Sequence, residues 1–321
     1  MPGDSPVPVI AEIVRSGFTE GAHHGSVVAL AADGSTSYAR GDVTGPVFPR
    51  SCSKPLQALA MVRAGLDLEG ELLALACASH SGEAFHLEGV GRILAAAGLG
   101  PDALANPADW PLVDVRDAYV RAGGQRSVLA MNCSGKHAAM LLTCVRNGWE
   151  THGYLDPAHP LQQQIRATVV EVTGEPVAHE GTDGCGAPLL SVSLTGLARA
   201  FATLATGERE EEQRIARAIR THPEWVSGTT RDERDLLTAV PGAIAKAGAE
   251  GCYAVALPDG RAFALKVEDG SARARPVVMA ALLARLGVDR EPGVDTEAVR
   301  RTGERLLTGG SAVVGEIRAV L

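Results

Sequence analysis

The sequence predicts an α/β fold, an α-β-α sandwich whose sheet is built from both ends of the chain. Both ends contain short runs rich in β-branched and small apolar residues, separated by turn residues. From about 52 to 240, apolar residues instead recur at the three- and four-residue spacing of amphipathic helices. We therefore expect a single domain with an α/β lobe (about 1–50 and 240–321) and an inserted helix-rich lobe (about 51–239).

The expected elements follow in order along the chain. Asp33-Gly34 is a hairpin turn signal near the N-terminus, and Pro258-Asp259-Gly260 is another near the C-terminus. The expected strands are 7–15, 25–32, 36–40, 252–257, 261–267 and 312–321. The expected helices are 56–65, 86–97, 137–147, 160–173, 188–205, 209–220, 275–286 and 295–307.

Composition excludes several classes of protein. The net charge of −8 argues against a nucleic-acid or anionic-membrane partner. No apolar stretch approaches the roughly 20 residues that span a bilayer, and the N-terminal stretch 1–17 lacks the pattern of a secretion signal. We expect a cytoplasmic protein whose six cysteines are free or metal-bound rather than paired in disulfides.

Lysine is scarce, and its positions are therefore informative. An arginine suits a solvated surface as well as a lysine does, but it does not lose its proton in proteins. A position that has lysine in this arginine-rich chain therefore predicts a role that needs an amine able to lose its proton. Only four of the thirty basic residues are lysine: Lys54, Lys136, Lys246 and Lys266.

The first lysine stands in R-S-C-S-K-P, residues 50–55. Pro55 is tolerated in the first turn of a helix, so the motif lies at a helix start. Ser51 and Lys54 are then neighbours at i and i+3. A serine hydroxyl becomes nucleophilic when an adjacent base takes its proton, and a neutral lysine is such a base. The alternative is a helix cap followed by a solvated lysine, but the scarcity of lysine favours the catalytic pair.

A second group of residues suggests a metal site. N-C-S-G-K-H (132–137) precedes a helix and offers Cys133, Lys136 and His137, and G-T-D-G-C-G (181–186) offers Asp183 and Cys185. Two thiols with nitrogen and oxygen donors suit a borderline-soft metal such as zinc. The alternative is a buried cysteine beside a flexible loop, and the residues alone leave the two interpretations even.

Two further loops complete the set of motifs. A-C-A-S-H-S-G-E (76–83) ends a helical run and offers polar side chains from Ser79 to Glu83. K-A-G-A-E-G (246–251) places Lys246 immediately before a strand. Each alone is an ordinary turn.

In this order, the five motifs resemble the asparaginase II family, typified by the inducible rhizobial L-asparaginase. The resemblance covers nearly the whole chain. It implies a fold like that of serine β-lactamases and glutaminases, a homodimer, and hydrolysis of L-asparagine to L-aspartate and ammonia. It also implies two Ser-Lys tandems, with zinc near the active site in some members.

Carried over by position, the resemblance implies specific roles. The first tandem is Ser51 with Lys54, and the second is Ser79 with Lys246. Ser81 competes with Ser79, Lys266 competes with Lys246, and either tandem serine is open as the acylated one. Zinc is implied on Cys133, Lys136 and Cys185, and substrate binding on Arg50, His80, His137, Asp183 and Glu250.

Rival functions remain open at this point. A glutaminase differs by one methylene of pocket length, typically worth ~1–3 kcal/mol. A β-lactamase or penicillin-binding type of acyl hydrolase shares the Ser-x-x-Lys chemistry. A non-catalytic zinc-binding module is a more distant alternative.

Overall fold

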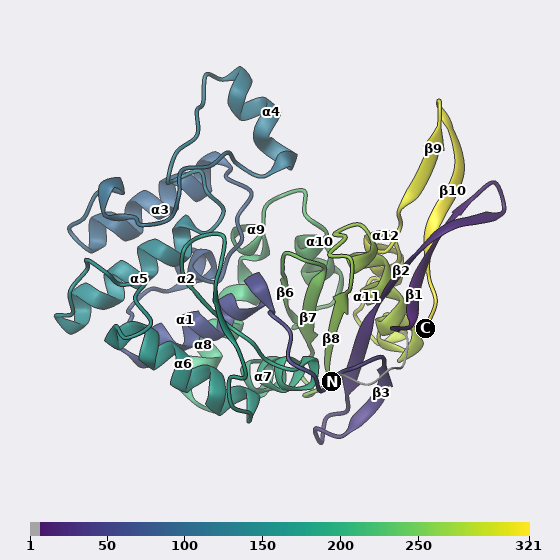
Figure 1. The fold of residues 1–321 in the computed structure, drawn as a ribbon, viewed down its shortest axis with the longest axis horizontal. Coiled ribbons are helices and arrows are strands. Elements are labelled where there is room, and N and C mark those ends of the chain that lie inside the picture. Colours follow the sequence, from purple (N-terminus) through teal and green to yellow (C-terminus); the bar gives the residue numbers. More distant parts are fainter. Residues whose placement is uncertain (1–6) are drawn as a thin grey trace. The chain divides into compact units, whose positions relative to one another are not determined.

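The computed structural model describes residues 7–321, which form two compact units whose elements are labelled in Figure 1. Unit 1 contains the N-terminal segment up to Cys52, Val192–Thr206 and Asp235–Leu321, and unit 2 contains Ser53–Ser191 and Gly207–Arg234. Residues 1–6, which open the stretch expected to lack a secretion signal, lie outside the described residues.

Unit 1 is built on an eight-stranded antiparallel sheet to which both ends of the chain contribute (Figure 1). The order across the sheet is β6-β7-β8-β2-β1-β10-β9, with β3 paired to β2. Asp33 and Gly34 form the turn of the β2–β3 hairpin, as the sequence predicts. The strands are β1 (Val9–Arg15), β2 (Phe18–Leu30), β3 (Thr36–Arg40), β6 (Ile244–Ala247), β7 (Cys252–Ala256), β8 (Ala262–Val267), β9 (Leu306–Gly309) and β10 (Ala312–Ala319).

Two long helices of unit 1 pack on this sheet. Helix α7 (Leu194–Thr206) contacts β2, β7 and β8, and α11 (Ala274–Arg285) contacts β1, β7, β8 and β10. Every residue of β7 is buried, so both faces of this strand are covered. The predicted α/β fold, with a sheet assembled from both ends of the chain, is confirmed. The shorter elements are α10 (Asp232–Ala239), η3 (Val288–Arg290) and α12 (Thr296–Thr302).

Unit 2 is mainly helical. Of its two longest helices, α5 (Ser134–Asn147) is buried on all sides over residues 134–144, whereas α6 (Pro160–Thr173) buries one face. Gly148 and Gly174 end these helices in the left-handed conformation that favours glycine. A two-stranded sheet, β4 (Glu180–Thr182) with β5 (Pro188–Leu190), holds the glycine-rich loop between them. The helices are α1 (Lys54–Arg63), α2 (Gly70–Ala76), α3 (Ala84–Ala96), η2 (Pro101–Ala103), α4 (Val113–Arg121), α5 (Ser134–Asn147), α6 (Pro160–Thr173), α8 (Glu210–Thr221) and α9 (Pro223–Val226).

Two expected helices differ from the structure. The helix expected over 188–205 begins only at Leu194, because Pro188–Leu190 is strand β5. A short apolar run fits a strand as well as a helix, and pairing with β4 decides it here. The helix expected over 295–307 ends at Thr302, and the chain then enters β9. Helix α7 belongs to unit 1 because it packs on the sheet, although the sequence places its residues in the helix-rich lobe.

Across residues 7–321, none of the helices combines the length and the apolar character needed to cross a lipid bilayer.

Candidate active site

The motif at 50–55 forms a short 3₁₀ turn, η1 (Arg50–Ser53), that leads directly into α1. Pro55 is in the first turn of α1, as predicted, where its missing N–H costs no helical hydrogen bond. Ser51 and Lys54 are both buried, with 9% and 1% of their surfaces exposed. A lysine this deeply buried is unusual unless its amine has polar partners.

The partners of Lys54 come from the loop after α2. Its Nζ donates to the carbonyl oxygen of Ala78 at 2.6 Å and to the hydroxyl of Ser79 at 3.0 Å. The structure thus brings together two of the four predicted catalytic side chains, Lys54 and Ser79. The competing Ser81 hydroxyl, fully buried, donates instead to the Glu83 carboxylate at 2.6 Å.

His80 lies in the same loop and faces α5. Its Nε2 is 2.9 Å from the Ser134 hydroxyl, and its backbone amide donates to the carbonyl oxygen of Asn132. Burial holds the pKa of His80 well below its usual value, and the positive charges of His86 and Lys54 act in the same direction. His80 is therefore a neutral imidazole at neutral pH.

The two motifs predicted to bind a metal lie together in unit 2. Cys133 caps α5, and Lys136, one turn into the helix, has its Nζ 3.3 Å from Sγ of Cys185. Cys133, Lys136 and Cys185 are each 4% exposed or less. The structure therefore places together all three residues to which the resemblance assigns zinc.

One thiolate is shared between the two cysteines. A hydrogen bond with Cys185 holds the pKa of Cys133 well below its usual value, and the same bond raises the pKa of Cys185. Burial acts to lower the pKa of Lys136. The charges of Cys185, Cys133 and Asp183 outweigh this effect, so the pKa of Lys136 is raised above its usual value. The cluster is a buried thiolate–ammonium pair.

The donor set of this cluster fits zinc through two thiols and an amine. Within residues 7–321, no three His, Cys, Asp or Glu side chains are grouped so as to hold a metal ion. The third protein donor would be Lys136 after loss of its proton. Oδ2 of Asp183 lies 3.8 Å from Sγ of Cys185 and would be close to the metal.

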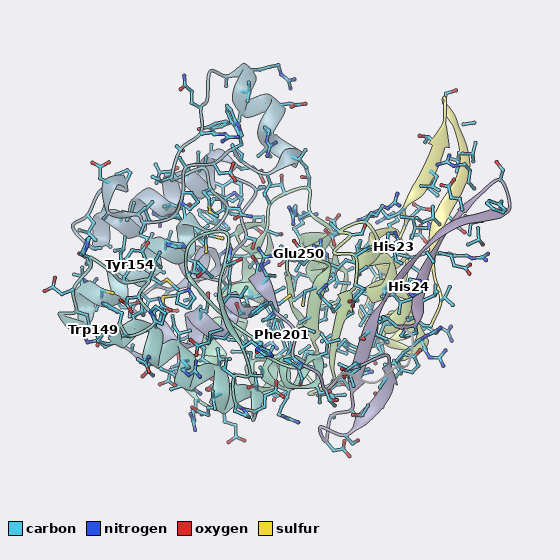
Figure 2. The ribbon with its side chains drawn as sticks, in the orientation of Figure 1. His23, His24, Trp149, Tyr154, Phe201 and Glu250 are labelled. Carbon is cyan, nitrogen blue, oxygen red and sulfur yellow. The ribbon has the colours of Figure 1, made fainter. Side chains whose placement is uncertain are left out.

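His137, the next residue of α5, lies close to Cys185 and also contacts Tyr154. Its Nδ1 is 2.7 Å from the Tyr154 hydroxyl, which also accepts a hydrogen bond from the backbone amide of Ala105. Burial lowers the pKa of His137 to about 4 and raises that of Tyr154. Tyr154, labelled in Figure 2, was not among the predicted site residues. A lone tyrosine 17 residues from its partner gives no local sequence signal.

Lys246 lies in β6 of unit 1 and is fully buried. Its Nζ donates to the carbonyl oxygen of Ala247 at 2.9 Å, and its own carbonyl oxygen accepts a hydrogen bond from Sγ of Cys52 at 3.0 Å. Gly248 lies close to Pro49, which precedes the Ser51 turn. A Cβ at Gly248 would be 2.6 Å from the carbonyl oxygen of Pro49. The K-A-G motif thus packs against the residues that flank Ser51.

Its competitor, Lys266, lies in β8 opposite Ser26 and Cys252 of the neighbouring strands. Lys266 is half-buried, and its Nζ donates to the carbonyl oxygen of Val267. Lys266 thus keeps contact with solvent, whereas Lys246 does not.

Arg50 and Glu250, both predicted to bind substrate, form a weak ion pair in unit 1, with Nη1 and Oε1 3.5 Å apart. Both have left-handed backbones, with φ of 50° and 56°. Such conformations are uncommon outside glycine and concentrate at functional sites. Glu250, labelled in Figure 2, has 61% of its side chain exposed.

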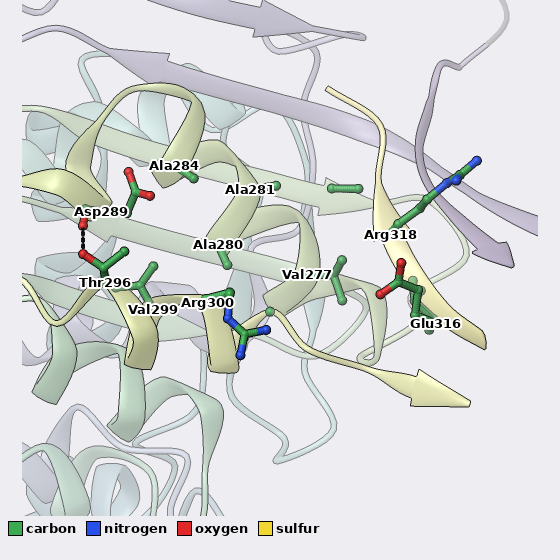
Figure 3. A pocket seen from close by; sticks show the side chains of 13 residues that line it. Val277, Ala280, Ala281, Ala284, Asp289, Thr296, Val299, Arg300, Glu316 and Arg318 are labelled. Atoms are coloured by element: carbon green, nitrogen blue, oxygen red, sulfur yellow. Dashed lines mark hydrogen bonds between the residues drawn. The ribbon is translucent and has the colours of Figure 1, made fainter. Parts of the chain in front are cut away.

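A groove of about 300 Å³ lies elsewhere in unit 1, between α11, α12 and β10 (Figure 3). Its floor is formed by alanines of α11, and Thr296 on its rim donates to the carbonyl oxygen of Asp289 at 2.6 Å. None of its lining residues belongs to the five motifs.

Comparison of the chain with models of known protein families finds the family that the five motifs resemble. The L-asparaginase II model covers residues 11–319. The chain belongs to the L-asparaginase II family. The resemblance drawn from the five motifs is confirmed, and membership of this family makes the protein an amidohydrolase.

The chain is also similar, at low sequence identity, to several solved structures. A β-lactamase from Mycobacterium bovis is 16% identical with a TM-score of 0.45, covering 81% of this chain and 94% of that chain. EstCE1, a hydrolase with promiscuous acyltransferase activity, is 16% identical with a TM-score of 0.40, covering 79% and 92%. Simvastatin synthase from Aspergillus terreus is 12% identical with a TM-score of 0.39, covering 76% and 88%. No curated protein sequence matches the chain.

Proposed function

We propose that this L-asparaginase II family member hydrolyses L-asparagine to L-aspartate and ammonia through a serine activated by Lys54. The observation that carries the proposal is the buried contact between the Lys54 amine and the Ser79 hydroxyl at 3.0 Å. With the amine unprotonated, the same contact lets Nζ accept a serine proton.

Two serines are available to Lys54, and their proposed roles differ. Ser51, three residues before Lys54 in the same helical stretch, attacks the side-chain amide carbon of the substrate. Ser79 exchanges protons with Lys54. The tetrahedral intermediate collapses as the amide nitrogen is protonated and leaves as ammonia, which forms the acyl-enzyme ester. Water then hydrolyses this ester to aspartate and regenerates the serine. The role predicted for Lys246 in the second tandem is part of the same proposal.

The chain's other site residues would hold the substrate. Arg50 and Glu250 carry the opposite charges that an amino-acid head group requires. Zinc bound by Cys133, Lys136 and Cys185 would supply a positive charge that orients that head group. Neutral His80 and His137 are suited to hydrogen bonding rather than to charge pairing.

The deciding experiment is ammonia release from L-asparagine and L-glutamine, measured side by side with the wild-type protein and with Lys54→Met. We expect release from asparagine, a smaller rate with glutamine, and loss of both in the variant. Ammonia from glutamine alone would make the protein a glutaminase. Covalent labelling by a fluorescent penicillin without ammonia release would instead indicate a penicillin-binding type of acyl hydrolase.

The homodimer implied by the resemblance and the cytoplasmic location expected from the sequence belong to this proposal as well. Light scattering after gel filtration measures the first, and cell fractionation measures the second.

A further inference from the structure

The carboxylate of Glu83 ties the loop that contains Ser79 to a second loop of unit 2. Its Oε1 accepts hydrogen bonds from the Ser81 hydroxyl at 2.6 Å and from the Thr229 amide at 2.9 Å. Its Oε2 accepts one from the Thr229 hydroxyl at 2.8 Å. One side chain thus joins two loops that are 146 residues apart in the sequence.

Glu83 does not serve the helix that follows it. It occupies the N-cap position of α3, where a carboxylate commonly accepts a hydrogen bond from the first turn. The Glu83 side chain makes no such capping bond. Both of its oxygens bind Ser81 and Thr229 instead, so helix stability does not explain the residue.

The two loops are joined a second time next to the candidate catalytic pair. The backbone amide of Ser79 donates to the carbonyl oxygen of Val226 at 3.1 Å. Lys54 binds the hydroxyl of Ser79, whereas the segment from Val226 to Thr229 binds its backbone. Any shift of that segment would therefore be transmitted to Ser79.

Gly228 shows how closely the segment fits. Its φ of +147° is a conformation that other residues rarely adopt. A Cβ at this position would lie 2.3 Å from Oγ of Ser81 and 3.0 Å from Oε1 of Glu83. The backbone approaches the Ser81–Glu83 pair so closely that only glycine fits.

The negative charge of Glu83 strengthens the hydrogen bonds that join the two loops. Burial opposes ionisation, but hydrogen bonds from Ser81 and Thr229 outweigh it and lower the pKa of Glu83 below its ordinary value. At neutral pH the carboxylate is an acceptor at both oxygens, and hydrogen bonds to a charged acceptor are stronger than those between neutral groups.

We propose that Glu83 is a positioning residue that holds Ser79 at the Lys54 amine by clamping the loop 79–83 to the segment 226–229. The inference rests on the proposed function for its catalytic readout, whereas the clamp itself is a property of the loops. The same contacts occupy Ser81, which leaves Ser79 as the serine of this loop that is bound to Lys54.

The test compares Glu83→Ala, Glu83→Gln and a matched control, Glu88→Ala, on the exposed face of the same helix. Gln keeps the shape of Glu and an acceptor for Ser81 and the Thr229 amide. We expect Glu83→Ala to lower kcat for asparagine by about 10- to 100-fold, because misplaced catalytic groups cost that much. We expect KM to change by less than about threefold, and Gln to restore kcat to within about threefold of wild type.

A second measurement does not depend on the reaction. Amide hydrogen exchange of the peptides spanning 78–84 and 225–230 should be faster in Glu83→Ala and unchanged in Glu88→Ala. Thr229→Val removes one donor from the less buried end of the clamp, so it tests the same contact if Glu83→Ala does not fold. By itself, Thr229→Val should accelerate exchange in both peptides. Where Glu83→Ala does fold, adding Thr229→Val to it should accelerate exchange little further, because both changes break the same contact.

Three results would overturn the inference: a kcat of Glu83→Ala within twofold of Glu88→Ala, a rise in KM alone, or a Gln variant as slow as the Ala variant. Unchanged exchange in Glu83→Ala would show that the clamp does not exist. If the wild-type protein releases no ammonia from any amide while exchange responds as expected, the proposed function fails and the clamp stands.

Discussion

The amine of Lys54 and the hydroxyl of Ser79 lie 3.0 Å apart in unit 2, although 25 residues separate them in the sequence. Both side chains are almost fully buried, and the second partner of the amine is a backbone carbonyl rather than a carboxylate. The Lys54 amine also lies close to the Cys133 thiol and helps to lower its pKa, so the contact with Ser79 and the thiol cluster are neighbours in unit 2.

The first prediction concerns this amine. Lys54→Arg keeps the positive charge but removes the base, so amide hydrolysis should fall by about 10²–10⁴-fold, as in Lys54→Met. Ser51→Ala should reduce the rate as strongly. Ammonia release, with circular dichroism as a check of folding, measures the effect. A Lys54→Arg protein with wild-type activity would exclude the general-base role.

The second prediction concerns zinc. Protein purified without chelator should contain about one zinc per chain, and Cys133→Ala and Cys185→Ala should each lose it. Cys144→Ala is the matched control, because it removes another buried thiol of the same helix outside the cluster. Elemental analysis counts the metal. Full occupancy in a Cys133/Cys185 double variant would refute the site.

Removal of the metal should also separate binding from chemistry. If zinc only orients the head group of the substrate, chelation should raise KM more than it lowers kcat. Return of the original KM on adding zinc to the apoprotein completes this test.

The third prediction compares two lysines of unit 1. Lys246→Met should abolish activity and Lys266→Met should retain it, because Lys246 is fully buried in the strand that packs against the segment around Cys52. Met keeps the length of the side chain and removes the amine. Activity measurements alongside thermal unfolding decide between them. The reverse result would move the second tandem to Lys266.

The fourth prediction uses the close approach at Gly248. Gly248→Ala should destabilise the protein by about 1–3 kcal/mol and lower kcat, because the new Cβ displaces the carbonyl oxygen of Pro49 next to the Ser51 turn. Gly91→Ala, where a Cβ meets nothing within 4 Å, is the control. Equal behaviour of the two variants in urea unfolding and in turnover would contradict the expected steric clash.

The fifth prediction concerns acid stability. Burial lowers the pKa of His86 from its ordinary 6.5 to about 4, so the unfolded chain takes up this proton first as the pH falls. Stability should be complete above pH 6.5 and decline between 6.5 and about 4, with His86 contributing up to about 3 kcal/mol of the loss. His86→Gln should flatten this decline, and the exposed His152→Asn should not. Urea unfolding at pH 7.5 and pH 5 measures the difference.

The sequence predicted local structure well where a pattern is long. The helix expected at 160–173 matches α6 residue for residue, because its apolar face, leading proline and terminal glycine are all local signals. The start of β2 at Phe18, before the expected strand at 25, was not predicted. Its first residues are mostly exposed and lack the alternation that marks a half-buried strand.

The site was predictable as a set of residues but not as a set of contacts. The spacing in the sequence predicts that Ser51 and Lys54 are neighbours, whereas the contact between Lys54 and Ser79 depends on the packing of α1 against α2. Glu83 belongs to one of the five motifs, but its proposed role depends on its contact with Thr229, which lies in a loop that contains none of these motifs. Contacts between residues this far apart in the sequence depend on tertiary packing, which local sequence patterns do not predict.

The burial of the lysines has a practical consequence for chemical probes. Lys54, Lys136 and Lys246 are each at most 1% exposed, whereas Lys266 is half-buried. A reagent that acylates amines will therefore react with Lys266 before the other three lysines of the folded protein. The slower labelling of those three would then measure how often each buried amine becomes accessible to solvent. A bound ligand that slows the labelling of one lysine would identify the part of the chain whose opening it suppresses.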